Sequence, residues 1–202
     1  LDEAILNESK FDLILSTIQL STDFPYILIS PLGSTKDESK ISIYINELYK
    51  TRNQKNTYSI LNDFFSSDLF FTDYDSETPK DVIRFLSERL YEKRIVSEKF
   101  YDSVMDRENI SPTSFEQFVA VPHPIAFDSY CSKGAICILN KPIIWGEYQV
   151  KIVILFAIKN EDRRKLKDYY SLIGDAIVDE TSLKKLLIAK TYQQFIEVFS
   201  SK

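Results

Sequence analysis

Histidine, cysteine and glycine are scarce in this sequence of 202 residues. It contains one histidine, His123, two cysteines, Cys131 and Cys137, and 4 glycines. A lone imidazole suits a metal site poorly, and two cysteines in a chain of this length fit free thiols in a reducing compartment. So few glycines also argue against a glycine-rich loop that binds nucleotide phosphates. We therefore expect a cytoplasmic protein without a bound metal or cofactor.

Long apolar runs and a positive net charge are absent as well. The longest apolar run, residues 152–158, is far shorter than the roughly 20 residues of a membrane-spanning helix, and no signal sequence opens the chain. The formal net charge is −5, and no basic stripe alternates with aromatic residues as in a nucleic-acid surface. We therefore expect no membrane insertion and no direct contact between this segment and nucleic acid.

The composition, with 44% hydrophobic and 27% charged residues, is typical of one or two compact domains. Thr78, Pro79 and Asp81 form a helix start, and Thr191 and Gln194 form a capping box. Aromatic side chains between residues 64 and 74 are assigned to core packing. The expected fold is α/β, a mixed sheet flanked by helices. Strands are expected at residues 118–121, 135–139 and 150–158, and helices from residue 79, at 97–106, 161–177 and 183–189, and from residue 191.

The segment with the clearest chemistry surrounds His123. An apolar strand, residues 118–121, ends at this imidazole, which stands between Pro122 and Pro124. Prolines end a strand and fix the backbone, so we expect the ring at a rigid strand end. A neutral imidazole near pH 7 is both a nucleophile and a base, which suits an acceptor of a transferred group. The alternative is a hydrogen-bonded structural histidine beside an apolar strand.

An ordered set of short motifs accompanies this histidine. The set runs through Arg107-Glu108, Thr113, Ala120-Val121-Pro122-His123 and Lys141-Pro142-Ile143-Ile144-Trp145 to the apolar strand at 150–158. In this order the motifs resemble the enzyme IIA domain, mannitol and fructose class, of the bacterial phosphoenolpyruvate-dependent phosphotransferase system. The resemblance covers residues 58–202. It implies that His123 accepts a phosphoryl group from the phosphocarrier protein HPr, as a phosphohistidine carrier rather than an enzyme that turns over a sugar.

Two further residues are candidates for holding the phosphoryl group. Phosphoryl transfer depends mainly on positioning and on stabilising the equatorial oxygens. The resemblance assigns this role to Arg107, whose planar guanidinium suits phosphate oxygens, and implies a hydroxyl donor at Thr113. Without the resemblance, Arg107 is an ordinary surface charge at a helix end, and Thr113 is a turn or cap residue.

The chain departs from the transport proteins of this family. Those proteins generally carry a second histidine where this chain has residues 159–165, so Arg163 or Arg164 becomes a candidate for approaching the phosphoryl group, unless the segment is only a solvated helix start. Glycines before the Pro-His motif are replaced by residues such as Glu116 and Phe118. Together with Pro124, these features are closer to enzyme IIA-like domains at the C-terminus of sugar-responsive regulators and antiterminators of the BglG, MtlR and LicR type, which contain phosphotransferase regulation domains (PRD).

Residues 1–50 have a different character. Apolar runs at 11–17 and 26–30 are typical of buried parallel strands, and residues 35–50 have the pattern of an amphipathic helix. They resemble the last half of a galactitol-type enzyme IIB-like domain, which directly precedes the IIA-like domain in these regulators. We therefore predict a IIB-like remnant at 1–50, a polar linker at 51–57 and a IIA-like domain at 58–202. On this interpretation the sequence begins inside a domain and neither cysteine takes the IIB role; the alternative is an N-terminal extension of a single domain.

Three functions are compatible with this organisation. The chain is a regulatory domain that reports sugar flux to an attached transcription regulator, or a transport enzyme IIA that passes its phosphoryl group to a IIB partner, or an interaction module that is never phosphorylated. The IIB-like remnant favours the first function.

The expected partners follow from that choice. They are phospho-HPr, enzyme IIB-type proteins and the upstream PRD and DNA- or RNA-binding domains of the parent chain, and a second copy of this chain is a further candidate. We expect HPr to bind a shallow apolar patch around the histidine, formed by Val119, Val121, Ile125 and Phe127.

Overall fold

The computed structural model describes residue 11 and residues 13–21, 25–115 and 118–200, with the backbone alone for residues 49–59 and 200. The chain divides into two compact units, Leu1–Asn53 and Gln54–Lys202. Among the described residues, no helix has both the length and the apolar character needed to cross a bilayer.

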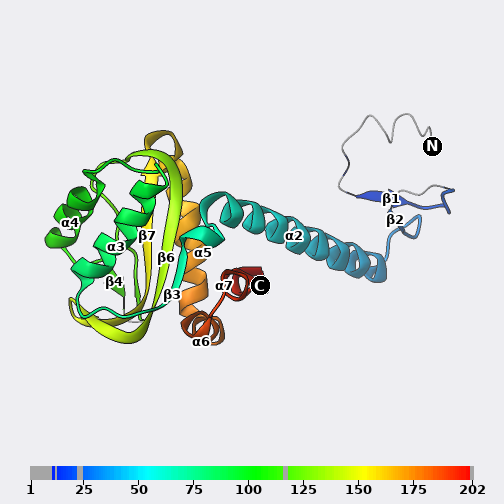
Figure 1. Cartoon of the computed structure of the whole chain (residues 1–202). Helices are drawn as coiled ribbons and strands as arrows, with labels where there is room; N and C mark the ends of the chain where they lie inside the picture. The colour runs from blue at the N-terminus through cyan, green and yellow to red at the C-terminus, as the bar shows by residue number, and fades with distance from the viewer. Residues whose placement is uncertain (1–10, 12, 22–24, 116–117, 201–202) are drawn as a thin grey trace. The chain divides into compact units, whose positions relative to one another are not determined.

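The first unit contains a small parallel sheet and the beginning of a long helix (Figure 1). Strands β1, Ile14–Ser16, and β2, Tyr26–Leu28, pair in parallel, as the two apolar runs predict, although each strand covers only part of its run. Helix α2, Thr35–Phe64, follows. Parallel pairing is therefore confirmed, whereas the assignment of residues 1–50 to a IIB-like domain stays a prediction.

Polar contacts organise the start of helix α2. The carboxylate of Asp37 accepts hydrogen bonds from the hydroxyl of Ser34 and from the backbone N–H of Ser30. These bonds, with that from Ser34 the larger cause, lower the pKa of Asp37 to about 2. Of the side chains described up to residue 48, Asp37 alone is buried. No hydrophobic core is therefore present among the described residues of this unit.

Helix α2 does not end where the sequence predicts. The pattern predicts a helix at 35–50 and a linker at 51–57, but the helix continues through these residues to Phe64. Residues 35–64 contain neither proline nor glycine, so no residue interrupts the helical hydrogen bonds. The boundary between the two units falls inside this helix, after Asn53.

The second unit is built on a mixed five-stranded sheet in the order β3-β6-β7-β5-β4 (Figure 1). Strand β3 pairs in parallel with β6, and β5 in parallel with β7, whereas the pairs β6-β7 and β4-β5 are antiparallel. The long strands β6 and β7 contain the strands predicted at 135–139 and 150–158. The strands are β3 Phe70–Tyr74, β4 Ser114–Phe115, β5 Val119–Ala120, β6 Asp128–Trp145 and β7 Tyr148–Lys159.

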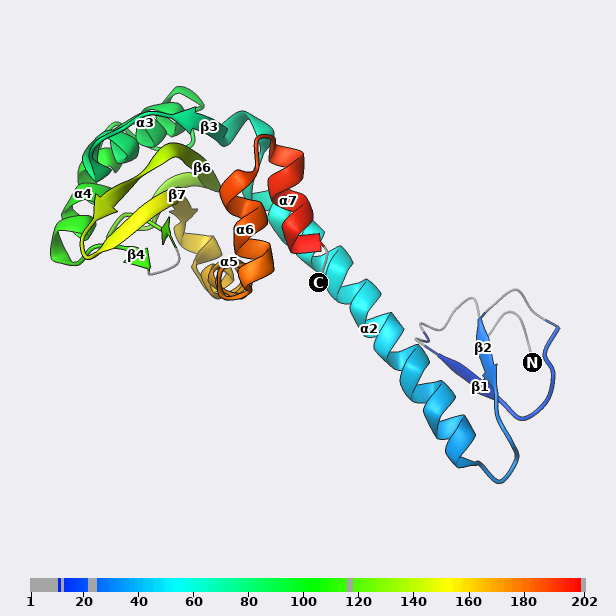
Figure 2. The ribbon, with the colours of Figure 1, turned by 90° about the horizontal axis from the view of Figure 1, so that it is seen from below.

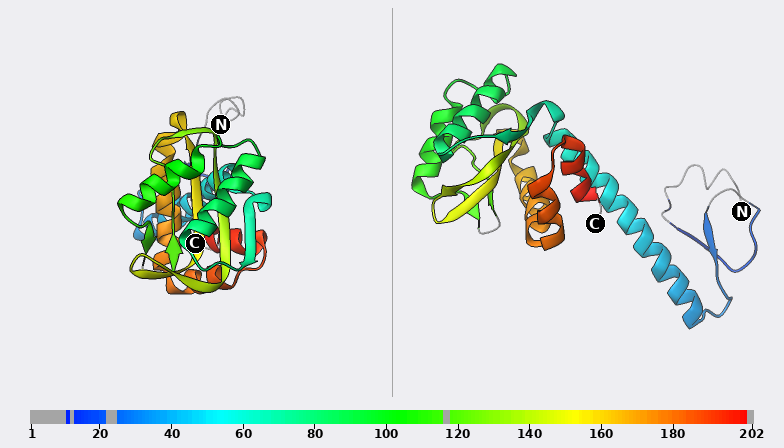
Figure 3. Two further views of the ribbon diagram at one scale, coloured as in Figure 1. Left: turned by 60° about the vertical axis from the view of Figure 1, so that its left-hand side comes forward. Right: turned by 60° about the horizontal axis from the view of Figure 1, so that its bottom comes forward.

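Helices cover both faces of this sheet, with α3 and α4 on one face and α5, α6, α7 and the end of α2 on the other (Figures 2 and 3). Alternation along β7 fills both cores, because Ile152 and Ile154 face α5 to α7, while Val153 and Leu155 face α3 and α4. Aromatic residues 64–74 pack in these cores, as predicted. The helices are α3 Pro79–Glu92, α4 Phe100–Ile110, α5 Leu166–Val178, α6 Glu180–Ile188 and α7 Tyr192–Ser200, with short 3₁₀ helices η1 Ser67–Leu69 and η2 Asn160–Lys165.

Two of the predicted helix starts, those of α3 and α7, are confirmed by their capping bonds. The hydroxyl of Thr78 accepts from the backbone N–H of Asp81, and that of Thr191 accepts from the N–H of Gln194, each at 3.2 Å. The bounds predicted for the helix at 97–106 are wrong, because α4 begins at Phe100 and continues to Ile110, and so contains Arg107 in its last turn. The helix predicted at 161–177 begins as the 3₁₀ helix η2, and α5 starts only at Leu166. A mixed sheet flanked by helices, the predicted fold class, is confirmed.

Candidate functional site

His123 lies just beyond strand β5 on a segment held by backbone hydrogen bonds. The N–H of Val121 donates to the carbonyl of Thr113 at 3.0 Å, and the N–H of Phe156 on β7 donates to the carbonyl of Pro122 at 2.9 Å. Both flanking prolines are buried, and the imidazole is half-buried. Because the prolines have no N–H to continue the ladder, the strand ends here. The ring therefore stands at a fixed strand end, as the sequence predicts.

The Nδ1 atom of His123 has two partners. It lies 3.0 Å from the carbonyl oxygen of Val121 and 3.2 Å from the hydroxyl of Tyr170. A proton on Nδ1 is donated to the carbonyl, which leaves the lone pair on Nε2. Burial is the main cause that lowers the pKa of His123; Arg107 acts in the same direction, against the Val121 carbonyl and Glu108. The imidazole is therefore neutral near pH 7 and has a nucleophilic nitrogen.

Tyr170, on helix α5, is a site residue that the sequence does not single out. Its ring packs against Phe156, with centroids 5.1 Å apart, and edge-on to His123. Burial raises the pKa of Tyr170 to about 12, so the phenol keeps its proton. It follows His123 by 47 residues and lies in α5, beyond residues 159–165, where the resemblance implies a second histidine. A tyrosine in an amphipathic helix looks like a core residue, so no signal in the sequence indicates its contact with His123.

Arg107 lies in the last turn of α4, and its charge reaches the imidazole. One guanidinium nitrogen, Nη1, donates to the carbonyl of Ser111 at 2.9 Å. The positive charge of Arg107 acts to lower the pKa of both His123 and Tyr170. Within the described part of the chain, Arg107 forms no ion pair with a carboxylate. Among the described residues no carboxylate therefore competes for this guanidinium, and the phosphate role of Arg107 stays a prediction.

Thr113 connects α4 to the segment that carries the histidine. Its N–H and its hydroxyl both donate to the buried carboxylate of Glu108, at 2.8 and 2.7 Å, and the indole N–H of Trp145 donates to the same carboxylate at 2.5 Å. The Thr113 hydroxyl proton is therefore held by Glu108 in this structure, and its role as a donor to a phosphoryl group stays a prediction. The sequence analysis includes Glu108 in a motif but gives it no role, because a carboxylate beside Arg107 in a helix looks like a surface residue.

The two arginines considered as substitutes for a second histidine lie in η2. The guanidinium of Arg163 lies over the ring of Phe127, 5.3 Å from its centroid, and both Arg163 and Arg164 are exposed. Neither arginine is among the groups described as contacting His123 or shifting its pKa. The second ring beside His123 is that of Tyr170.

The apolar patch predicted around His123 is partly wrong. Val119 and Val121 are only 1% and 2% exposed, because both pack into the core beneath α5 to α7. Ile125 is 54% exposed and Phe127 is half-buried, so these two side chains are accessible. Only one half of the predicted set is therefore available to a partner.

Phe118 occupies a position where the resemblance implies glycine. Its backbone has φ 62, in the left-handed region that is costly for an aromatic residue. The carbonyl of Phe118 accepts from the N–H groups of Lys151 and Ile152, which hold the backbone in this conformation. Glu116, the other replacement noted, lies outside the described residues.

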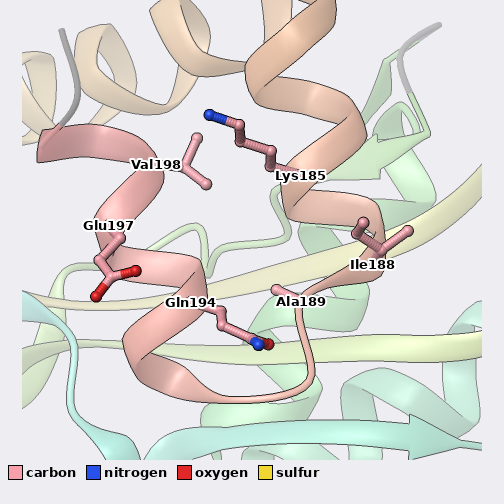
Figure 4. Close-up of a pocket in the computed structure, with 6 residues that line it drawn as sticks. All are labelled: Lys185, Ile188, Ala189, Gln194, Glu197 and Val198. Carbon is pink, nitrogen blue, oxygen red and sulfur yellow. The ribbon is translucent and has the colours of Figure 1, made fainter.

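A cleft elsewhere in the unit does not include the imidazole. It lies between α6 and α7 and has a volume of about 320 Å³ (Figure 4). No group of three or more His, Cys, Asp or Glu side chains within the described residues is arranged to hold a metal ion. The groups that act on one another at the histidine are an imidazole, a phenol and a guanidinium. The cleft is lined by Lys185, Ile188, Ala189, Gln194, Glu197 and Val198.

Known proteins resemble this chain in sequence and in fold. The family model described as "Phosphoenolpyruvate-dependent sugar phosphotransferase system, EIIA 2" matches residues 63–202. Two curated relatives come from Bacillus subtilis (strain 168). The "Probable licABCH operon regulator" is 28% identical over 200 residues, 98% of this chain and 30% of the relative. The "Transcriptional regulator ManR" is 32% identical over 173 residues, 85% of this chain and 26% of the relative. The chain thus spans less than a third of either relative.

A solved structure shares the fold. The complex of enzyme IIAMTL and phosphorylated enzyme IIBMTL from Escherichia coli matches with a TM-score of 0.61 and 21% identity, over 69% of this chain and 100% of that chain. Since the family model covers more than half of the sequence, this chain belongs to the EIIA 2 family of the phosphoenolpyruvate-dependent sugar phosphotransferase system.

Proposed function

We propose that the chain is a regulatory domain that accepts a phosphoryl group from phospho-HPr on Nε2 of His123 and reports it to an attached transcription regulator. The observation that carries the proposal is the neutral imidazole whose Nδ1 contacts the Val121 carbonyl; the charge of Arg107 acts on this ring, and Arg107 forms no ion pair with a carboxylate among the described residues. A proton held at Nδ1 keeps the lone pair on Nε2, the nitrogen that must attack phosphorus.

The residues support a direct transfer. The Nε2 lone pair forms the bond to phosphorus while the bond between phosphorus and the donor nitrogen breaks, and the electron pair of that bond returns to the donor. Negative charge is spread over three equatorial oxygens during this step, and catalysis consists mainly of positioning and charge stabilisation. Arg107 is the candidate for stabilising that charge, because its planar fork matches phosphate oxygens.

The regulatory part of the proposal rests on the relatives. The two curated relatives are named as regulators, and the match to the licABCH operon regulator covers 98% of this chain, so it extends over the first unit. In this proposal the domain works in the cytoplasm, and its partners are phospho-HPr and the DNA- or RNA-binding and PRD domains of a longer chain. The first unit is the remnant of an enzyme IIB-like domain.

A transport role is the second candidate, because one solved structure that shares the fold is a complex with a phosphorylated enzyme IIB. In that role the domain would pass the phosphoryl group on to a IIB partner. Mixing the labelled chain with a mannitol-type enzyme IIB separates the two candidates: rapid loss of label to the IIB protein favours transport, and retention favours regulation.

The direct test is labelling of the purified chain by phosphoenolpyruvate, enzyme I and HPr. We expect an acid-labile label in the wild type and none in His123→Ala, because the chain has no other imidazole. Label that persists in His123→Ala would exclude the assignment. In a full-length regulator, His123→Ala and the charge-mimicking His123→Asp should then change transcription in opposite directions, and identical activity of both variants and the wild type would contradict the regulatory role.

A further inference from the structure

One nitrogen of His123 is shared between two groups of different hydrogen-bonding capacity. Nδ1 lies 3.0 Å from the Val121 carbonyl and 3.2 Å from the Tyr170 hydroxyl. A carbonyl can only accept, whereas a phenol can donate as well as accept. With a proton on Nδ1, the ring donates to Val121; without it, the Tyr170 hydroxyl donates to the Nδ1 lone pair. Both protonation states of this nitrogen therefore have a partner in place.

Tyr170 is held in a position to donate to Nδ1 when that nitrogen has no proton. Its ring packs against Phe156, whose own N–H donates to the carbonyl of Pro122 and so fixes the segment that carries the histidine. The phenol and the imidazole are therefore positioned by the same residue of β7. Two charged groups, Arg107 and Glu108, act on the pKa of His123, and both lie in α4.

The position of this proton decides how easily a phosphoryl group leaves Nε2. When Nδ1 is protonated, breaking the bond between Nε2 and phosphorus releases a neutral imidazole. When Nδ1 has lost its proton to solvent, the same step would release an imidazolate anion, a much poorer leaving group. A hydroxyl that donates to the unprotonated Nδ1 lowers the proton affinity of that nitrogen. Less of the readily cleaved protonated form is then present, and the phosphoryl group is lost more slowly.

We propose that Tyr170 is a positioning residue that donates its hydroxyl to Nδ1 of phosphorylated His123 and so prolongs the lifetime of the phosphoryl group. Arg107 favours the same neutral ring by its positive charge, whereas Glu108, the Val121 carbonyl and the phosphoryl group itself favour the protonated ring. This inference rests on the proposed function, since it concerns the fate of the phosphoryl group on that histidine. A long-lived phosphoryl group suits a domain that reports its phosphorylation state to a regulator rather than one that only passes the phosphoryl group on.

The test compares Tyr170→Phe with Tyr169→Phe. The first variant removes the hydroxyl at Nδ1 and keeps the ring against Phe156. The control removes the hydroxyl of the neighbouring tyrosine, whose ring stacks on Phe64. Each protein is phosphorylated by HPr and separately by phosphoramidate, a small chemical donor, and loss of phosphate is followed after the donor is removed. Circular dichroism confirms that the variants are folded.

We expect Tyr170→Phe to shorten the lifetime about three- to tenfold near pH 8, the range for loss of one hydrogen bond between neutral groups. The difference from the wild type should disappear in acid, where Nδ1 is protonated in every protein. Tyr169→Phe should match the wild type throughout. Equal lifetimes for all three proteins, or the same shortening at every pH, would overturn the inference.

A second measurement does not require phosphorylation. Nitrogen NMR of the single imidazole reports which nitrogen carries the proton, and Tyr170→Phe should increase the form protonated on Nδ1 and move the titration of His123 to higher pH. Absence of both changes contradicts the hydrogen bond itself. If HPr fails to label any protein while phosphoramidate succeeds, the proposed function fails and the role of Tyr170 is still decided by the lifetimes.

Discussion

At the scale of single residues, the site depends on how three side chains share one small region. His123 supplies the nucleophile, Tyr170 contacts its Nδ1, and Arg107 supplies positive charge without a carboxylate partner among the described residues. An arginine whose charge acts on a neutral imidazole, and which forms no ion pair within the described part of the chain, is suited to binding a dianion transiently. The arginine should therefore affect the rate of transfer more than the stability of the fold.

Arg107→Gln tests this role. We expect phosphorylation by phospho-HPr to slow by about tenfold or more, which corresponds to about 1.4 kcal/mol or more of lost transition-state stabilisation. Arg164→Gln removes the same charge from an exposed position in η2 and should leave the rate unchanged. Single-turnover labelling measures both rates. Equal slowing in the two variants would show that net charge, and not the placement of Arg107, determines the effect.

The candidate site could be predicted from the sequence only in part. His123 and Arg107 belong to motifs that are continuous in sequence, so they could be named before the structure. Tyr170 could not, because its contact with His123 spans 47 residues and depends on how α5 packs on the sheet. Long-range packing also explains why part of the predicted apolar patch around His123 is wrong. Val119 and Val121 flank Ala120 along the chain, and both face the core that α5 to α7 cover, whereas Ala120 faces the opposite core.

At the scale of elements, Gly134 and Gly174 differ in how much space surrounds them. A Cβ added at Gly134 in β6 would lie 2.3 Å from a ring atom of Phe65 and 2.7 Å from one of Phe64, so the end of α2 packs directly on this backbone. A Cβ added at Gly174 in α5 would meet no atom within 4 Å. The strand therefore needs its glycine, and the helix does not.

Alanine substitutions should thus shift stability in opposite directions. Gly134→Ala is expected to destabilise by about 1–3 kcal/mol through overpacking against two buried rings. Gly174→Ala is expected to stabilise by up to about 1 kcal/mol, because alanine loses less conformational entropy in a helix. Urea denaturation of the two variants and the wild type measures the difference. A Gly134→Ala protein as stable as the wild type would show that the aromatic rings can move aside.

Elements with strong local signals were predictable, and those defined by long-range contacts were not. The starts of α3 and α7 follow from Thr78 and Thr191, whose capping bonds are local. Strand β4 has two residues and exists only through pairing with β5, so no pattern could indicate it. The polar residues 51–57 looked like a linker, yet the absence of proline and glycine was the better guide.

At the scale of the whole molecule, the two units differ in what stabilises them. The second unit has two hydrophobic cores on opposite faces of its sheet. The first unit has three-residue strands, and apolar side chains such as Leu15, Leu28 and Ile43 are exposed. Burial of apolar surface is the main source of folding free energy, so the second unit should account for nearly all of the measured stability.

A fragment of residues 54–202 tests this division. We expect it to fold, to unfold within a few degrees of the full chain and to accept phosphate on His123 at the same rate. Thermal denaturation followed by circular dichroism and the labelling assay give the comparison. A fragment that is unfolded, or that melts far below the full chain, would mean that residues 1–53 contribute to the core of the second unit.

The hairpin of β6 and β7 has a consequence for the order of folding. These central strands are joined by a short turn at Gly146, so their pairing closes the smallest loop in the sheet and costs the least chain entropy. Strands β3 and β5 must instead attach in parallel from distant positions, and β5 contributes only two paired residues. We therefore expect the segment that carries His123 to join β7 after the β6-β7 hairpin has formed. A peptide spanning residues 107–124 alone would keep the β4-β5 pairing but lack β7 and the tyrosine that contacts the imidazole.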